Sequence, residues 1–594
     1  MNSRFGHHFQ DNQTSFRVWA PRCKTVQLET RDPRPQFREM KQAADGFYEI
    51  SVDDVSHGDA YRFRLNGEIS RPDPASHAFE DSVHQWNTAI DHRQYSWRSS
   101  WSGVPKRDLI IYELHIGTFT RQGTFASAKA GIRKLAELGV TAIELLPLAQ
   151  CPGKWNWGYD GVGIWAVQNT YGTPDQFKDL VDHCHELGIA VILDVVFNHL
   201  GPEGNYLSEF GPFFNQKRKT PWGDGLNFDG RHNQPVRDFM SDCAVHWIRN
   251  YRLDGLRMDA VHFMYDDSDE PVSMSITRSV DENCDDLDWP IHLIGETNVR
   301  SASLTREAST AGTGFDAVWS DCMMHSVLGI AQPGLDLCHR EHRGGEDLAR
   351  ALHQGFIHEN FPYERNDAGE RAELDSFVIG FQNHDTVGNH PLGLRLHQLA
   401  SPKFQQAAAA LYLLYPSIPM IFMGEEFAAE TPFLFFADFS DPWVREGVEK
   451  GRAGEFPELS AKLGGLSPLD EQSFFRSKLE PLSTTDAPMW TWYQNLIKIR
   501  KKFQQSGVID SQSLAVTADS AAGVFEMTYP ASDLSSGLRV LVRLCEPGSD
   551  PKPHSINVAG QTVLLSSDKK DPAKDGIIEM GSCEALVLEL SHNR

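Results

Sequence analysis

The chain has 594 residues, which is too long for one hydrophobic core and predicts two or three domains. Its 81 acidic residues against 56 basic ones give a net charge of -25, which disfavours nucleic acids and anionic membranes as partners and suits a neutral ligand such as a sugar. The nine cysteines include no Cys-x-x-Cys pair, so they predict neither a disulfide framework nor a thiolate metal site.

The N-terminus and the longest apolar run bear on the compartment. The segment from Met1 to Gln13 contains no apolar core of the length that a signal peptide needs, so we predict a cytoplasmic protein. The apolar run from Ala407 to Gly424 is interrupted by Pro416 and Pro419, which break a spanning helix. That run therefore predicts a helix, a turn and a buried strand rather than a membrane span.

The first hundred residues alternate apolar and polar side chains in short runs. Tyr61, Phe63 and Leu65 alternate with arginines and are followed by Asn66-Gly67, a sequence typical of a β-hairpin turn. We predict an N-terminal β-sandwich domain over residues 1–100.

The central region changes to short, unbroken apolar strands that alternate with longer amphipathic stretches. This pattern indicates βα units around a parallel sheet, and eight such units close a (β/α)8 TIM barrel, an α/β fold. We therefore predict a barrel domain over residues 101–505. Its strands are expected near Ile110–Thr118, Ala142–Leu148, Ala190–Asn198, Gly255–Val261, His292–Glu296, Ala317–Ser320, Phe377–Gln382 and Met420–Gly424.

Strict alternation returns after residue 505. Leu538, Val540, Val542 and Leu544 are spaced by two, and the segment from Cys583 to Leu590 follows the same pattern. This pattern predicts a C-terminal β-sandwich domain over residues 506–594.

Polar side chains gather at the C-terminal ends of the predicted barrel strands, which is where barrel enzymes place their chemistry. Three of these strands each deliver a carboxylate, and burying three carboxylates near one axis is costly unless a substrate or basic partners compensate. Packing alone does not account for such a set. The polar residues at these ends are Asn198, His199, Arg257, Asp259, His262, Glu296, His384 and Asp385.

Cleavage of a glycosidic bond is the chemistry that uses such a set, because one carboxylate attacks the anomeric carbon and a second protonates the departing oxygen. Arg257 lies two residues before Asp259, so both side chains point to one face of a strand and the guanidinium can hold Asp259 ionised, as a nucleophile requires. Glu296 ends the next strand and suits a proton donor, because a neighbouring carboxylate and loss of water raise its pKa.

These strand-end segments resemble, in order, the four signature stretches of the α-amylase family. The resemblance implies a double-displacement mechanism with Asp259 as nucleophile, Glu296 as acid/base and Asp385 as transition-state stabiliser. It also implies that a carbohydrate-binding-module-like domain precedes the barrel. The sugar-binding residues that it implies are Tyr159, which stacks on the sugar being cleaved, His199, Arg257 and His384, together with His262 on the leaving-group side.

Five further stretches resemble the members of that family that act on trehalose-ended glucans. The resemblance implies a hydrolase that cleaves the α-1,4 bond between trehalose and the maltooligosyl chain of maltooligosyltrehalose, with water as the second substrate and no cofactor. The stretches begin at Tyr112 (Tyr-Glu-Leu-His-Ile-Gly-Thr-Phe), Lys154 (Lys-Trp-Asn-Trp-Gly-Tyr-Asp-Gly), His199 (His-Leu-Gly-Pro-Glu-Gly-Asn-Tyr), Gln382 (Gln-Asn-His-Asp-Thr-Val-Gly-Asn) and Met423 (Met-Gly-Glu-Glu-Phe).

Two alternatives remain open. A 1,4-α-glucan branching or debranching enzyme shares the N-terminal β domain and the three carboxylates, although branching enzymes lack the Leu-Gly-Pro-Glu-Gly-Asn-Tyr run from Leu200 to Tyr206. A non-catalytic scaffold of the same fold is the second alternative, but such scaffolds have lost carboxylates, whereas Asp259, Glu296 and Asp385 are all present here.

Two other polar motifs are predicted to have no function of their own. His183-Cys184-His185 contains metal-ligand types, but the three side chains splay around a predicted helix, so we expect them on its surface. The acidic run from Asp266 to Glu270 lacks the glycine and the distal glutamate of a calcium loop, which predicts a solvated loop. We therefore predict no metal site.

Overall fold

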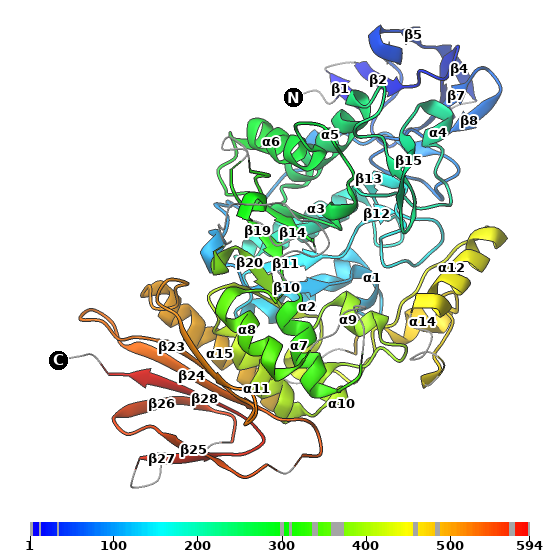
Figure 1. The fold of residues 1–594 in the computed structure, drawn as a ribbon. Helices are drawn as coiled ribbons and strands as arrows, with labels where there is room; N and C mark the ends of the chain where they lie inside the picture. Colours follow the sequence, from blue (N-terminus) through cyan, green and yellow to red (C-terminus); the bar gives the residue numbers. More distant parts are fainter. Residues whose placement is uncertain are drawn as a thin grey trace.

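The computed structural model has three parts along the chain, an N-terminal pair of sheets, a central barrel with its helices, and a C-terminal group of sheets (Figure 1). The predicted architecture is confirmed, while the domain boundaries at residues 100 and 505 stay predictions. The structure describes residues 4–591 except 11–12, 32–34, 298–301, 308–311, 336–342, 358–372, 456–460, 462, 481–486, 550 and 569–575.

The N-terminal part contains two antiparallel sheets with a shared core. Tyr61, Phe63 and Leu65 of β7 are buried, as their alternation predicts, and Asn66 and Gly67 turn the chain into β8 with φ of 53° and 68°. Only a residue that tolerates the left-handed region fits there. One sheet consists of β1 (Gly6–Gln10), β2 (Gln13–Trp19), β6 (Phe47–Val52) and β5 (Lys41–Gln42), the other of β4 (Gln36–Glu39), β3 (Val26–Thr30), β7 (Ala60–Leu65) and β8 (Ile69–Arg71), with β9 (Asn87–Thr88) paired to β7.

Eight parallel strands close the barrel, one for each predicted segment. Several are shorter than predicted at their C-terminal ends, because the chain leaves the hydrogen-bonded ladder before the polar residues that the patterns had included. The functional side chains therefore lie just beyond the strands. The strands are β10 (Ile111–Leu114), β11 (Ala142–Leu145), β14 (Ala190–Val195), β17 (Gly255–Met258), β18 (His292–Gly295), β19 (Ala317–Trp319), β20 (Phe377–Ile379) and β21 (Ile418–Phe422).

Helices alternate with these strands, and several begin with residues that favour helix initiation. Thr124 and Thr173 cap α2 and α3 with capping boxes, and Pro174 occupies the first turn of α3. The apolar run around residue 410 forms α11, a turn and β21, as predicted. The longer helices are α2 (Phe125–Leu138), α3 (Pro174–Glu186), α5 (Gln234–Tyr251), α6 (Val272–Cys284), α7 (Cys322–Ala331), α8 (Gly345–Gln354), α11 (Pro402–Leu413), α12 (Pro442–Glu455) and α15 (Pro488–Gln505).

Smaller elements fill the loops beyond the barrel strands. Two hairpins follow β11 and β14, and short helices follow β10 and β20. These elements are β12 (Ala149–Gln150) with β13 (Gly163–Val167), β15 (Phe214–Thr220) with β16 (Gly223–Leu226), α1 (Ile116–Phe119), α4 (Leu207–Phe210), α9 (His384–Asn389), α10 (Leu396–Leu399) and α14 (Glu471–Arg476).

The C-terminal part has a five-stranded sheet and a two-stranded one. The predicted strands around residues 540 and 586 are present, but both faces of β24 are largely buried, because one packs on α11 and the other on the smaller sheet. The larger sheet runs β22 (Ala515–Asp519), β23 (Val524–Tyr529), β24 (Gly537–Leu544), β28 (Cys583–Leu590) and β26 (Gln561–Ser566), and the smaller pairs β25 (His554–Asn557) with β27 (Ile577–Met580).

Two minor predictions are wrong. Cys184 and His185 of α3 are buried rather than on a helix surface, because the ring of Trp101 stacks on His185 at 4.3 Å between centroids and the His185 ring meets Asp254 at 2.9 Å. The carboxylate of Asp266 is not solvated either, since Arg237 pairs with it. Among the described helices, none is long and apolar enough to cross a membrane.

Candidate active site

Arg257 is the centre of the polar network at the C-terminal mouth of the barrel. Its side chain, only 1% exposed, comes from β17, and its Nη1 atom lies 2.8 Å from Oδ1 of Asp259 and 2.7 Å from Oδ2 of Asp194. The predicted pairing of Arg257 with Asp259 is therefore present. Asn198 donates a second hydrogen bond, of 2.9 Å, to the other oxygen of Asp259. Both oxygens of that carboxylate are thus held in place by hydrogen-bond donors.

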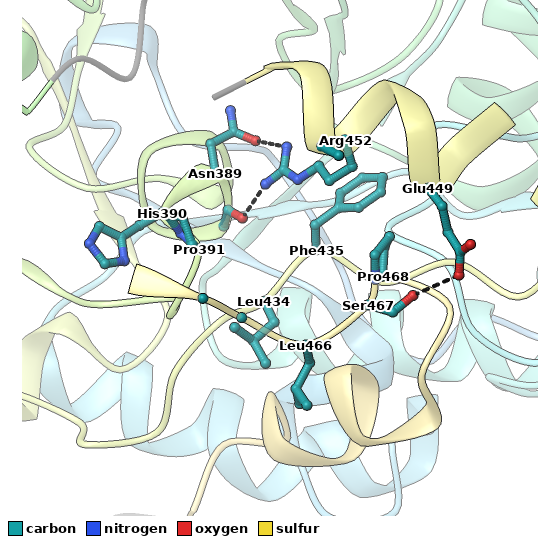
Figure 2. A pocket seen from close by; sticks show the side chains of 14 residues that line it. Asn389, His390, Pro391, Leu434, Phe435, Glu449, Arg452, Leu466, Ser467 and Pro468 are labelled. Atoms are coloured by element: carbon teal, nitrogen blue, oxygen red, sulfur yellow. Dashed lines mark hydrogen bonds between the residues drawn. The ribbon is translucent and has the colours of Figure 1, made fainter. Parts of the chain in front are cut away.

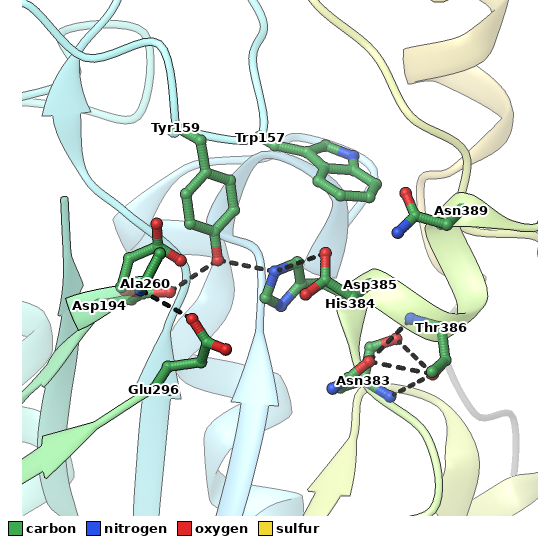
Figure 3. A network of polar contacts seen from close by, with 12 residues as sticks. Trp157, Tyr159, Asp194, Ala260, Glu296, Asn383, His384, Asp385, Thr386 and Asn389 are labelled. Carbon is green, nitrogen blue, oxygen red and sulfur yellow. Dashed lines mark hydrogen bonds and ion pairs between the residues drawn. The ribbon is translucent and has the colours of Figure 1, made fainter. Parts of the chain in front are cut away.

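Glu296 directly follows β18, the barrel strand that pairs with β17. Its Oε2 accepts a hydrogen bond of 2.7 Å from the backbone N–H of Ala260 (Figure 3). The Arg257 Nη2 atom is 3.9 Å away. Burial raises the pKa of Glu296 to about 7, and the charges of Asp259 and Asp385 act in the same direction while Arg257 opposes them. The carboxyl can therefore hold a proton near neutral pH.

Asp385 lies on α9 rather than at the end of β20, which corrects the prediction of a strand-end position. Asn383 caps that helix, so Asp385 sits in its first turn, where the positive end of the helix dipole favours a carboxylate. Its side chain is 53% exposed and lies 3.5 Å from Nε2 of His384. Asp385 is thus the most open of the three carboxylates, beside Asp259 at 13% and Glu296 at 23%.

A chain of hydrogen bonds links the two sides of the site (Figure 3). The Tyr159 hydroxyl donates to Asp194 over 2.7 Å and lies 2.8 Å from Nε2 of His384, whose Nδ1 is 2.6 Å from Glu113. Burial lowers the pKa of His384, but Asp385 and Glu113 outweigh it and raise the pKa to about 9. His384 therefore carries a positive charge at neutral pH.

The other two predicted histidines lie near an exposed tryptophan. Trp222 is 49% exposed, and its ring stacks on His199 with centroids 4.6 Å apart. Phe263 packs against Trp222 at 5.2 Å and against His262 at 4.4 Å. These rings form an aromatic wall next to Asn198, which contacts both His199 and Asp259.

A cavity of about 410 Å³ opens beside the C-terminal end of α9 (Figure 2). Arg452 of α12 enters it from above, donates to the Asn389 side chain and to the Gly388 carbonyl, each over 2.8 Å, and lies over the Phe435 ring at 4.9 Å. Asn389, which lines this cavity, the α9 cavity, ends the short helix whose first turn carries Asp385 (Figure 3).

Two buried carboxylates of the site, Asp194 and Glu113, were not singled out as candidates from the sequence. Asp194 and Glu113 lie within strands β14 and β10, and Asn198 follows β14. Burial raises the pKa of Asp194 to about 6. The available signal was a carboxylate inside an otherwise apolar strand, which Glu144 of β11 also shows. A carboxylate buried inside a strand needs a hydrogen-bonding or charged partner, and in a barrel such a partner comes from another strand or loop.

Two family models and several solved structures match the chain. The family model for the α-amylase catalytic domain matches residues 117–221, and the model for carbohydrate-binding module 48, the isoamylase N-terminal domain, matches residues 4–79. Among solved structures, an α-amylase-like protein from Salmonella typhimurium has a TM-score of 0.87 with 32% identity and covers 99% of this chain and 100% of its own. A pullulanase from Anoxybacillus sp. LM18-11, at 19% identity and a TM-score of 0.69, covers 99% of this chain and 87% of its own and shares the fold.

Three relatives match most of the chain and carry one name, malto-oligosyltrehalose trehalohydrolase. The protein from Saccharolobus solfataricus is 38% identical over 84% of this chain and 87% of its own length. That from Arthrobacter ramosus is 34% identical over 88% and 92%, and that from Rhizobium sp. is 32% identical over 96% and 97%. With this identity over most of the length, the chain belongs to the malto-oligosyltrehalose trehalohydrolase family.

Proposed function

We propose that this protein hydrolyses maltooligosyltrehalose at the α-1,4 bond that joins trehalose to the maltooligosyl chain. The observation that carries the proposal is the arrangement around Arg257, which contacts Asp259 at 2.8 Å and Glu296 at 3.9 Å. A fixed carboxylate beside a carboxyl with a pKa of about 7 is the pair that glycosidic cleavage needs. The names of the relatives support the choice of substrate.

In the first half of the reaction Asp259 attacks the anomeric carbon of the sugar and a glycosyl–enzyme ester forms. The bond from that carbon to the glycosidic oxygen breaks, and Glu296 gives its proton to the oxygen, which leaves as a hydroxyl of trehalose. Arg257 and Asn198 hold the attacking carboxylate in one orientation.

In the second half Glu296, now ionised, takes a proton from water, and the resulting hydroxide attacks the anomeric carbon. The ester bond to Asp259 breaks, the maltooligosaccharide leaves, and both carboxyl groups return to their starting states. Asp385 lies beside the reacting sugar, where it binds hydroxyl groups and steadies the distorted ring, and the positively charged His384 lies 3.5 Å from that carboxylate.

The two ends of the substrate bind on opposite sides of the catalytic carboxylates. Because Glu296 protonates the departing oxygen, the trehalose unit lies on the Glu296 side of the site, towards the aromatic wall that includes His199, Trp222 and His262. The maltooligosyl chain runs past Asp385 into the α9 cavity, where Arg452 and Phe435 offer a guanidinium and a ring face to a glucose unit (Figure 2).

Arg452→Ala tests this placement. A hydrogen bond to a charged group contributes about 1.5–3 kcal/mol, so we expect KM to rise roughly tenfold or more for long maltooligosyltrehaloses, with kcat little changed. The shortest substrate, whose sugars do not reach the cavity, is expected to keep its KM. Lys450→Ala on the same helix is the control, because Lys450 pairs with the exposed Glu446 outside the cavity. A loss of kcat at every chain length contradicts the placement.

Product analysis tests the activity itself. The purified protein is incubated with a maltooligosyltrehalose and, separately, with the plain maltooligosaccharide of equal length, and trehalose and reducing ends are quantified. We expect rapid trehalose release and little attack on the plain chain. Branching or debranching of plain glucans without trehalose release moves the protein to another branch of the α-amylase family, and no reaction with any glucan favours a non-catalytic scaffold.

The cytoplasm is the compartment that we propose for this reaction. The eight cysteines in the described part of the chain are all free thiols, six of them buried, which suits a reducing environment. The net charge of -25 favours a neutral glucan over nucleic acid or an anionic membrane as partner.

A further inference from the structure

Three histidines meet where the N-terminal part contacts the barrel. His77 follows β8, His92 begins the short helix η2 (His92–Gln94), and His246 lies on α5 of the barrel. Each offers a ring nitrogen, and these three nitrogens lie within 4.8 Å of one another. We propose that His77, His92 and His246 bind a divalent first-row metal ion, with zinc as the best match.

The spacing of the three rings is close to that of a metal site. Nε2 of His92 is 3.2 Å from Nδ1 of His77, and the rings of His77 and His246 lie 4.2 Å apart between centroids. Zinc–nitrogen bonds of about 2.0–2.1 Å place tetrahedral ligand atoms roughly 3.3 Å apart, so the trio needs to contract by about 1 Å or a little more. His77 and His246 are fixed in the interior, whereas His92 is only half-buried and can make most of this movement.

His246 is already oriented as a metal ligand. Its Nε2–H donates to the backbone carbonyl of Trp165 over 3.0 Å, which leaves the lone pair on Nδ1. A carbonyl that binds the outer ring nitrogen in this way fixes the tautomer of metal-bound histidines. The lone pair now accepts a hydrogen bond of 2.9 Å from Asn250, an amide that lines the same cavity and turns aside when an ion binds.

Hydrogen bonding within the trio is also incomplete, on the side of the His92 ring away from His77 as well as between the two rings. Nδ1 of His92 is buried and has no hydrogen-bond partner among the described residues. A buried nitrogen without a partner costs free energy unless water or another group reaches it. His77 and His92 also face each other with nitrogen towards nitrogen, an arrangement in which only one of the two atoms can carry the proton.

The charge state of the cluster also fits a cation. Burial lowers the pKa of His246 to about 3 and the pKa values of His77 and His92 well below the usual range, so the three rings are neutral and keep their lone pairs at pH 7. The ammonium of Lys178 lies nearby, donating to the His92 carbonyl, but Asp175 pairs with it at 3.2 Å and weakens its repulsion of an ion.

Space and ligand type point to zinc with one open position. The cavity beside the trio has a volume of about 330 Å³, enough for an ion and its water. Three neutral imidazoles and a water molecule form a four-coordinate ligand set that suits zinc. Calcium and magnesium prefer oxygen ligands and do not suit this set. A bound ion would tie the segment around residues 77–92 to α5, so its effect is on stability and not on the carboxylates of the barrel mouth.

Metal titration of the tag-free, chelator-treated full chain tests the proposal. Zinc binding is measured by calorimetry, and cobalt is added separately because tetrahedral cobalt gives strong visible absorption. We expect one ion per chain, cobalt bands that zinc removes, and a rise in the midpoint of thermal unfolding with zinc. Wild-type protein that binds no zinc at micromolar concentrations, or that gives no cobalt bands, overturns the site and leaves a packed cluster of neutral histidines.

A matched pair of variants assigns the ligands. His92→Gln removes the half-buried ligand with little risk to folding, and we expect it to weaken zinc binding by at least about 100-fold, beyond the 10–100-fold effect of second-sphere changes. His8→Gln is the control, because His8 lines the same cavity but is not one of the three. Equal zinc affinity of His92→Gln and wild type overturns the assignment, while trehalose release from maltooligosyltrehalose is expected to be the same in all three proteins.

Discussion

Replacing Asp259 with Asn is expected to lower kcat by a factor of about 10⁴ or more, because removal of a nucleophile has effects of that order in other covalent enzymes. The amide has the shape of the carboxylate, and its single oxygen can still accept from Arg257, while Asn198 keeps its hydrogen bond of 2.7 Å to the backbone carbonyl of residue 259, so the fold and the binding of substrate are largely preserved. The loss therefore falls on kcat, with KM little changed.

Rapid-mixing kinetics and mass spectrometry check this prediction. With a substrate whose second step is slow, such as a fluorinated glycosyl fluoride, the wild-type chain is expected to accumulate one sugar ester on the peptide that contains Asp259. The Asn variant is expected to show none. An ester on another residue, or undiminished turnover of maltooligosyltrehalose by the variant, disproves the assignment of Asp259.

Glu296→Gln is expected to lower kcat by about 10² to 10⁴, the usual contribution of a general acid, and to change the pH profile. Since the pKa of Glu296 is raised to about 7, the carboxyl keeps its proton below that pH and loses it above. The wild-type kcat/KM is therefore expected to fall as pH rises through about 7. The Gln variant cannot titrate at this position, so this basic limb is expected to disappear.

An activated leaving group separates this role from a structural one. Fluoride leaves a glycosyl fluoride without needing a proton, so the first step with that substrate is expected to be slowed far less by Glu296→Gln than the first step with maltooligosyltrehalose. Asp259→Asn serves as the comparison, because it blocks the first step with both substrates. Equal slowing of both substrates by the Gln variant, or a persistent basic limb, contradicts the role of Glu296.

The fold was predictable because its signals are local. Each barrel strand is an unbroken apolar run of a few residues, and each was located from that run alone. Strand ends were predicted too far along, since Val196 and Phe197 continue the apolar pattern of β14 although the backbone has already left the sheet. Burial of both faces of β24 could not be predicted from the sequence, because it depends on contact with a helix, α11, that is more than a hundred residues away.

The site was predictable to the extent that its residues are close in sequence. Arg257 and Asp259 share one stretch, so their contact followed from the two-residue period of a strand. The contact of Glu113 with His384 spans 271 residues, and no spacing rule reaches that far. The same limit applies to the histidine cluster, in which His246 joins a segment from another part of the chain.

The charge on His384 determines the direction of the hydrogen bonds around Tyr159. A histidine whose pKa is about 9 carries both ring protons at neutral pH, so Nδ1–H points to Glu113 and Nε2–H points to the oxygen of Tyr159 or of Asp385. The Tyr159 hydroxyl in turn gives its own proton to Asp194. With its proton committed in this direction, the phenol has none to offer a sugar, and the ring face remains as its recognition surface.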